Sequence, residues 1–295
     1  MQNRHNDVTV TGVLRNEGDT VFIESGDGSR FFEEHILWKG YQSHWLNQKV
    51  QARMLPQKDY QKGQNIILLW PFRETDSEPF IELYYNERLV KYPASLLGHL
   101  AINVNNEIFN FSHLLNENEI ITPEEYFYRP ALGEFSTTPE KKCFNTEDLS
   151  HPYYDKFGRN FMRTIHVARI VGVDTKRLSE YYKEQLRIIH ATISNPVKPE
   201  KYSDFNFITR SCTTIIRDGL NEIGFSKLKG IFPRDMFISA TWDFLTHHKA
   251  GTLKMALRVM KQLKVEEAEY SKLSPLMNTT NMLKYRLLKK KGYNI

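Results

Sequence analysis

Residues 202–225 read YSDFNFITRSCTTIIRDGLNEIGF and contain Cys212, one of the two cysteines in the chain. Hydrophobic residues recur at helical spacing after this cysteine, and Gly224 is typical of a helix end. Ser211 is a good N-cap, so we expect Cys212 in the first turn of a helix. The unpaired N–H groups and the dipole of that turn favour the thiolate form. Cys212 is therefore either a nucleophile or a small residue packed under a strand. The two roles can be distinguished by whether the sequence also supplies a general base for the thiol.

A candidate base lies in residues 97–112, LGHLAINVNNEIFNFS. Their apolar and β-branched content predicts two strands joined by a turn at a pair of asparagines. In such a hairpin Asn110 returns near the level of His99. A histidine facing a helix-terminal cysteine can activate it, and a polar group on the next strand can hold the imidazole in one tautomer. Asn110 is the best candidate for that group, with Ser112 and His113 behind it.

These two stretches resemble motifs of one family. The run GHLAINVNNEIFN is similar to the histidine hairpin of the NlpC-type papain-like cysteine hydrolases. Residues 202–214 resemble the cysteine-helix signature of the circularly permuted branch, in which the histidine precedes the cysteine. That branch includes YiiX-like proteins and lecithin–retinol acyltransferase. The resemblance spans residues 80–245, and it implies a permuted papain-like catalytic domain.

The resemblance also implies residue roles. Cys212 would be the nucleophile, His99 the general base and then the general acid, and Asn110 the orienting residue. The backbone N–H of Cys212 would stabilise the oxyanion. Many relatives carry histidine or an acid where this chain has Asn110. Tyr202 and Ser211 are the candidates for substrate contact.

The chemistry implied is hydrolysis of an amide bond through a thioester, as in a thiol protease or amidase. The substrate would be a peptide, peptidoglycan or an acyl lipid, and one setting for such an enzyme is an injected bacterial effector. A thiol acyltransferase or lipid esterase is the alternative enzyme. A non-enzymatic binding protein is the third alternative. No cofactor is expected, and no metal, because the sequence lacks HExxH, CxxC and carboxylate clusters at ligand spacing.

Composition sets wider limits. A hydrophobic content of 40% and a net charge of +5 are ordinary for a globular protein and do not demand nucleic acid. Two cysteines favour a reduced compartment over a disulfide scaffold. There is no ordinary signal peptide and no apolar run of about 18 residues, so no membrane span is expected. The chain is expected in the cytoplasm as synthesised, with a dedicated secretion system as the route if it leaves the cell.

We expect an α+β protein with three parts. Residues 1–74 should form a small β-barrel of the OB or SH3 kind from about five strands. Residues 75–245 should form the catalytic domain, with helices predicted over 158–194. Residues 246–295 should form a basic helical extension.

The expected barrel has two interpretations. Its aromatic and basic residues could bind nucleic acid, but barrel core and rim is the favoured interpretation, and the barrel could instead position a protein partner. These residues are Trp38, Tyr41, Trp45, Arg53 and Lys58.

Overall fold

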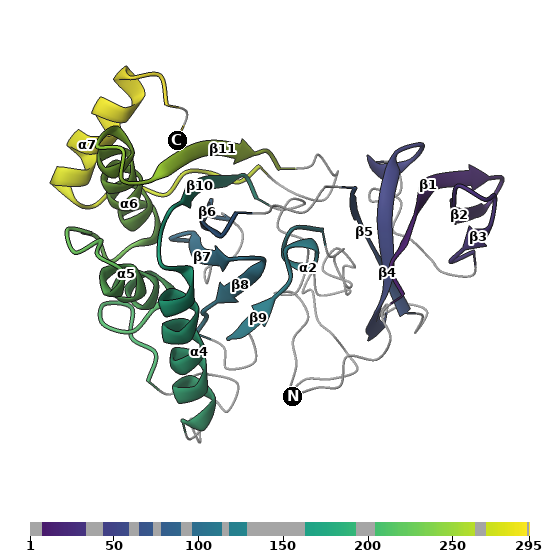
Figure 1. Cartoon of the computed structure of the whole chain (residues 1–295), viewed down its shortest axis with the longest axis horizontal. Helices are drawn as coiled ribbons and strands as arrows, with labels where there is room; N and C mark the ends of the chain where they lie inside the picture. The colour runs from purple at the N-terminus through teal and green to yellow at the C-terminus, as the bar shows by residue number, and fades with distance from the viewer. Residues whose placement is uncertain are drawn as a thin grey trace, which may run out of the picture. The chain divides into compact units, whose positions relative to one another are not determined.

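The chain is a mixed α+β protein with two antiparallel sheets, as seen in the computed structural model (Figure 1). It divides into two compact units, Met1–Thr75 with Glu124–Phe161, and Asp76–Pro123 with Met162–Ile295. The residues described by the structure are 8–33, 44–58, 65–72, 78–89, 96–113, 118–128, 163–192, 204–262, 270–293 and 295.

The first unit contains a five-stranded antiparallel sheet in the order β3-β2-β1-β4-β5. Its strands are β1 Val10–Glu17, β2 Thr20–Glu24, β3 Arg30–Phe31, β4 Lys49–Lys58 and β5 Asn65–Pro71. Every second residue at the start of β1 is buried, which is the period of a strand with one face on a core. The strands predicted in this part of the chain are confirmed, and closure into a barrel stays a prediction.

Two of the barrel residues singled out in the sequence belong to the core of this unit. Trp45 is buried and packs edge-on against Tyr128, with 5.6 Å between the ring centroids. Arg53 is buried and pairs with Glu125 and, at 3.6 Å, with Glu124, both from α2, Pro123–Tyr128. The guanidinium is thus neutralised inside the unit and does not face a polyanion. Trp38, Tyr41 and the side chain of Lys58 lie outside the described residues.

The second unit is built on a six-stranded antiparallel sheet in the order β11-β10-β6-β7-β8-β9. Its strands are β6 Phe80–Asn86, β7 His99–Val104, β8 Glu107–Asn110, β9 Glu119–Ile121, β10 Ile165–Val171 and β11 Lys254–Met260. The predicted hairpin is confirmed as β7 and β8. Its turn residues Asn105 and Asn106 have φ of 51° and 70°, the left-handed pair that a two-residue hairpin turn requires.

Of the two helices predicted over 158–194, the second is confirmed and the first is wrong. Among the described residues of this range, only those of α4, Thr175–Ala191, are helical, and Asp174 caps α4 as expected, accepting the N–H of Arg177 at 3.0 Å. The residues before it form β10, which lies between β6 and β11. Most residues of β10 are buried on both faces, so it reads as an apolar run without the alternation of a half-exposed strand.

The prediction of an all-helical extension over 246–295 is also wrong. Residues Lys254–Met260 form β11, which pairs with β10 at the edge of the sheet. Of the described residues after β11, only α7, Thr279–Lys290, is helical. The C-terminal part of the chain therefore completes the second unit.

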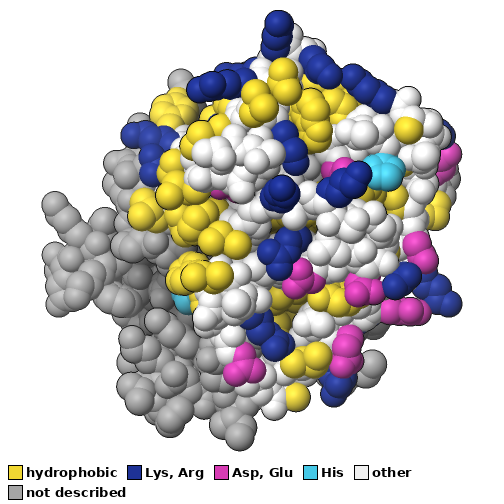
Figure 2. All heavy atoms as spheres, turned by 90° about the vertical axis from the view of Figure 1, so that its left-hand side faces the viewer, with side chains coloured by type: hydrophobic (Ala, Val, Ile, Leu, Met, Phe, Trp, Pro, Cys, Tyr) yellow, Lys and Arg dark blue, Asp and Glu magenta, His cyan; other side chains and the backbone are white. Residues whose placement is uncertain are grey.

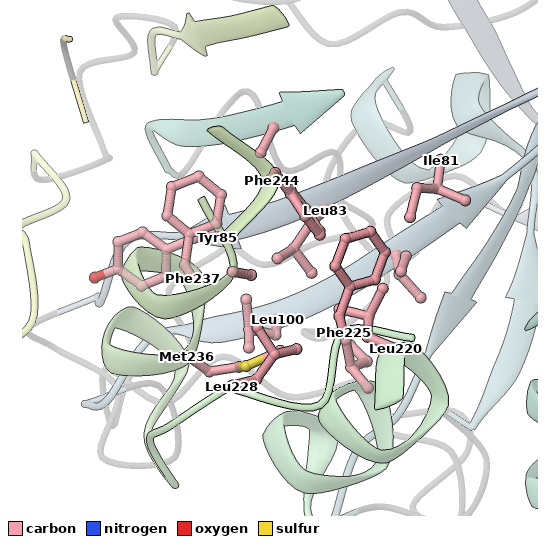
Figure 3. Packing of buried hydrophobic residues seen from close by; sticks show 14 of the residues in the cluster. Ile81, Leu83, Tyr85, Leu100, Leu220, Phe225, Leu228, Met236, Phe237 and Phe244 are labelled. Atoms are coloured by element: carbon pink, nitrogen blue, oxygen red, sulfur yellow. The ribbon is translucent and has the colours of Figure 1, made fainter. Parts of the chain in front are cut away.

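Helices cover one face of the six-stranded sheet, and a single apolar core fills the space between them (Figure 3). The covering helices are α4, α5 Cys212–Glu222 and α6 Pro233–Lys249, and α7 packs against α6. Leu83, Tyr85 and Leu100 point into this core from the strands, and Leu220 and Phe237 meet them from the helices.

A buried carboxylate at the start of α6 fixes the chain that leads into α7. Asp235 accepts the backbone N–H groups of Met277 at 2.9 Å and Asn278 at 3.0 Å. The side-chain amide of Asn281 donates to the backbone carbonyl of Asp235 at 3.0 Å. Since Asp235 and Asn281 are fully buried, these bonds hold α7 to the helical layer without competition from water.

Candidate active site

Cys212 is the first residue of α5, as the sequence predicted. The hydroxyl of Ser211 accepts the N–H of Thr214 at 3.5 Å, and the hydroxyl of Thr214 accepts the N–H of Ser211 at 2.8 Å. This reciprocal pair is a capping box, and it fixes where the helix begins. Because Ser211 is buried and its hydroxyl is occupied by the cap, its predicted contact with substrate stays a prediction.

The surroundings of the thiol do not favour the thiolate in the resting protein. Cys212 is half-buried and packs against the apolar core. Burial raises the pKa of its thiol, while hydrogen bonds from the backbone N–H of Leu100 and from Thr213 act in the opposite direction. The Sγ atom lies 3.9 Å from the hydroxyl oxygen of Thr213. The helix terminus thus does not outweigh desolvation, contrary to the expectation from the sequence.

His99 and Asn110 come together as the sequence analysis expected. Nε2 of His99 lies 2.7 Å from Oδ1 of Asn110. An amide oxygen only accepts hydrogen bonds, so Nε2 of the neutral ring carries the proton and Nδ1 carries the lone pair. Asn110 stands opposite Ala101 in the β7–β8 ladder, so its side chain reaches His99 diagonally across the hairpin.

A glycine sets the approach of the chain to His99. Gly98 has a φ of 76°, and a Cβ atom there would lie 2.6 Å from the carbonyl oxygen of Asn86. No other residue fits this close approach without moving β6. Gly98 therefore positions His99 as the first residue of β7, directly opposite Asn86.

The thiol meets β7 at the peptide between His99 and Leu100. Residues directly opposite in a sheet share a face, so His99 lies on the same face as Asn86 and Asn110, whereas Leu100 points into the helix-covered core. Cys212 reaches this strand from the core side, through the Leu100 amide. The thiol thus contacts the backbone of β7 at Leu100, the residue that follows His99. The imidazole of His99 projects from the opposite face of the strand.

The face of the sheet that carries His99 also holds a buried polar network that the sequence analysis missed. Glu82 accepts hydrogen bonds from Arg258 at 2.9 Å and from the hydroxyl of Tyr84, and Arg169 is 3.5 Å away. Asn103 donates to the same tyrosine hydroxyl at 3.0 Å. The available signal was Glu82 within an otherwise uncharged strand, because the two-residue period of a strand puts Glu82 and Tyr84 on one face.

A short turn just before Cys212 exposes two large hydrophobic side chains. The side chain of Asn206 accepts the N–H groups of Ile208 at 2.8 Å and Thr209 at 3.2 Å, which closes the turn. Phe207 and Ile208 at its tip are 61% and 63% exposed. Tyr202, expected to contact substrate, lies outside the described residues, as does Cys143.

Comparison with protein-family models, curated proteins and solved structures gives no match. The resemblance to NlpC-type hydrolases therefore remains a prediction from two motifs. Among the described residues, no three histidine, cysteine, aspartate or glutamate side chains gather as a metal site would require. None of the described helices is both long enough and apolar enough to cross a membrane.

Proposed function

We propose that this chain is a cysteine-nucleophile hydrolase that cleaves an amide bond, in a peptide or a peptidoglycan stem peptide, through a thioester. The observation that carries the proposal is the 2.7 Å hydrogen bond between Nε2 of His99 and Oδ1 of Asn110. The residue after His99 is Leu100, whose backbone N–H donates to the Cys212 thiol. This combination supplies a nucleophile, a base of defined tautomer and an orienting group.

In the proposed reaction, the His99 side chain leaves Asn110 and swings past the start of β7 to the thiol at the Leu100 amide. Its Nδ1 then removes the thiol proton as Sγ of Cys212 attacks the amide carbon. Cys212 is the first residue of α5, so no carbonyl of an earlier helical turn accepts its N–H, which would donate to the oxyanion. The C–N bond breaks, the imidazolium gives its proton to the leaving amine, and a thioester remains. Water, deprotonated by His99, then attacks the thioester carbon and releases the acid and the thiol.

The raised pKa of Cys212 defines the resting state of this proposed pair. Burial disfavours the thiolate, so Cys212 rests as a thiol. Proton transfer then accompanies attack on the substrate. Reactivity should therefore follow the protonation of the imidazole and not a preformed thiolate.

Acylation by p-nitrophenyl acetate tests the proposal without knowledge of the substrate. We expect one hydroxylamine-labile acetyl group on Cys212, detected by intact-mass spectrometry and absent from Cys212→Ala. The His99→Ala chain should acylate at least 100-fold more slowly, because general-base catalysis contributes on the order of 10²–10⁴. Equal acylation rates in the native and His99→Ala chains would remove His99 from the mechanism.

A second candidate is a thiol acyltransferase or lipid esterase, and the exposed Phe207 and Ile208 beside the cysteine helix favour it. The two side chains would hold an acyl chain next to the thiol. If so, p-nitrophenyl octanoate should acylate Cys212 faster than the acetate, and Phe207→Ser with Ile208→Ser should remove that preference. Tyr270→Ser, at an equally exposed site, is the control. An unchanged preference in the double variant would exclude this role for the turn.

A further inference from the structure

The outward face of α7 is unusually apolar for an exposed helix. Asn281 and Leu288 are buried and attach α7 to the second unit, so the opposite side of the helix faces solvent. That side exposes three large hydrophobic residues, Met282, Leu283 and Leu287, at 37%, 58% and 36%. Nothing within the described part of the second unit covers them.

The segment that contains α7 is strongly cationic. Residues 270–295 contain six lysines and arginines and no aspartate or glutamate, namely Lys272, Lys284, Arg286, Lys289, Lys290 and Lys291. No ion pair among the described residues involves any of these six side chains. The hydrophobic residues of α7 alternate around the helix with Arg286, Lys289 and Lys290, which are also exposed.

Neighbouring groups strengthen this positive charge. Lys249, at the end of α6, lies against Lys291 and adds a further basic side chain beside α7. Lys289 lies 5.4 Å from the ring centre of Tyr285, and Lys291 lies 5.4 Å from that of Trp242. Both ammonium groups thus lie over aromatic rings, and neither pairs with a carboxylate among the described residues.

We infer that the outward face of α7 binds the surface of an anionic lipid bilayer, with Met282, Leu283 and Leu287 entering the headgroup boundary and Arg286, Lys289 and Lys290 contacting lipid phosphates. Figure 2 shows hydrophobic and basic side chains interspersed over the upper part of the helical side of the molecule, where α7 lies. Because α7 has 12 residues and is held to the second unit along one side, it would lie in the plane of the interface and not span it.

The composition of the face favours lipid over an acidic protein. Protein interfaces are enriched in aromatic residues and arginine and depleted in lysine. Of the exposed cations at residues 286–291, only Arg286 is an arginine and the other three are lysines, and the exposed hydrophobic residues of α7 are leucine and methionine. A cluster of four to eight lysines and arginines on an amphipathic helix is typical of binding to anionic lipids.

Vesicle co-sedimentation of the full chain tests the inference. Phosphatidylcholine vesicles are compared with vesicles that also contain phosphatidylserine. The first variant combines Arg286→Gln, Lys289→Gln and Lys290→Gln, and a second combines Leu283→Ser with Leu287→Ser. The matched control removes the same charges from α4, through Lys176→Gln, Lys183→Gln and Arg187→Gln. Circular dichroism confirms that each variant is folded.

We expect binding to the anionic vesicles only. Each cation near such a surface changes partitioning by about fivefold, so the α7 charge variant should bind on the order of 100-fold more weakly, and the control should bind nearly as the native chain does. The serine variant should also lose at least tenfold. If the α4 control loses as much vesicle binding as the α7 charge variant, the binding depends only on the net charge of the chain, and the inference is overturned. Absence of vesicle binding, or retention of the chain by a poly-glutamate column alone, would overturn it as well.

Discussion

Replacement of Asp235 by alanine should detach α7 from the helical layer. The carboxylate accepts two backbone N–H groups, from Met277 and Asn278, at 2.9 and 3.0 Å, and it is fully buried. Hydrogen bonds to a charged acceptor contribute about 1.5–3 kcal/mol each. Met277 is itself exposed, so water can replace part of this loss. We therefore expect the free energy of unfolding to fall by about 2–4 kcal/mol.

Two further variants make this prediction specific. Asp235→Asn keeps one acceptor oxygen but turns an NH₂ group toward the other backbone N–H, so it should cost about 1–3 kcal/mol. Asp243→Ala removes a carboxylate from the same helix, where the charge acts on Lys284 only at longer range. It should change the stability by less than about 1 kcal/mol.

Hydrogen exchange of the α7 amides measures the effect where it should occur. A loss of 2–4 kcal/mol in local stability accelerates exchange by roughly 30- to 900-fold. The amides of β7 should exchange as in the native chain, because they do not depend on the carboxylate of Asp235. If α7 exchanges equally fast in Asp235→Ala and Asp243→Ala, the carboxylate does not hold the helix.

Three further predictions concern α5 and its contacts. Gly219→Ala should destabilise the chain by up to about 2 kcal/mol in urea unfolding, because a Cβ atom there would lie 2.4 Å from the ring of Tyr182 and this overpacking exceeds the gain in helix propensity. Asn221→Ala, exposed on the same helix, is the control. Ser211→Ala should cost about 1 kcal/mol through loss of the cap before Cys212. Burial raises the pKa of Tyr182 well above its ordinary value, so this residue alone should lower the stability above about pH 10 by up to about 1.4 kcal/mol per pH unit. Tyr182→Phe should remove that share and make the total fall shallower.

The sign of the alkaline effect follows from the protons bound. Above the pKa of tyrosine in the unfolded chain, the unfolded state loses a proton that folded Tyr182 retains. Unfolding therefore becomes easier as the pH rises, and the contribution is fully present only below that pKa. A slope unchanged in Tyr182→Phe would assign the loss to other groups. Likewise, a stability gain in Gly219→Ala, or no change in Ser211→Ala, would contradict the packing and capping described for α5.

Local sequence signals predicted the elements whose cause is local. The Asn105-Asn106 turn, the cap at Ser211 and the stop at Gly224 depend on residues a few positions apart, and the structure confirms each of them. The same signals misassigned β10 and β11. β10 is a buried central strand and lacks the alternation of polar and apolar residues, whereas β11 is an edge strand whose mixture of basic and apolar residues resembles an amphipathic helix. Only their pairing with distant segments identifies both as strands.

The candidate site shows the same division. The hairpin geometry sufficed to bring Asn110 to His99, because both lie on one pair of neighbouring strands. The pKa of Cys212 could not be predicted, since it depends on burial by a core assembled from both ends of the unit. The contact of the thiol with the Leu100 amide is equally non-local, because more than a hundred residues separate the two.

The rate of alkylation of Cys212 by iodoacetamide, followed from pH 5 to 10, tests most directly whether His99 acts as its base. The chain carries Cys143→Ser so that a single thiol reacts. With a neutral thiol–imidazole pair, we predict a rise in rate across pH 5–8, where imidazoles titrate, and a second rise where the thiol ionises. His99→Ala should abolish the first rise and leave the second. A single rise above pH 8, identical in both chains, would contradict the proposed pair.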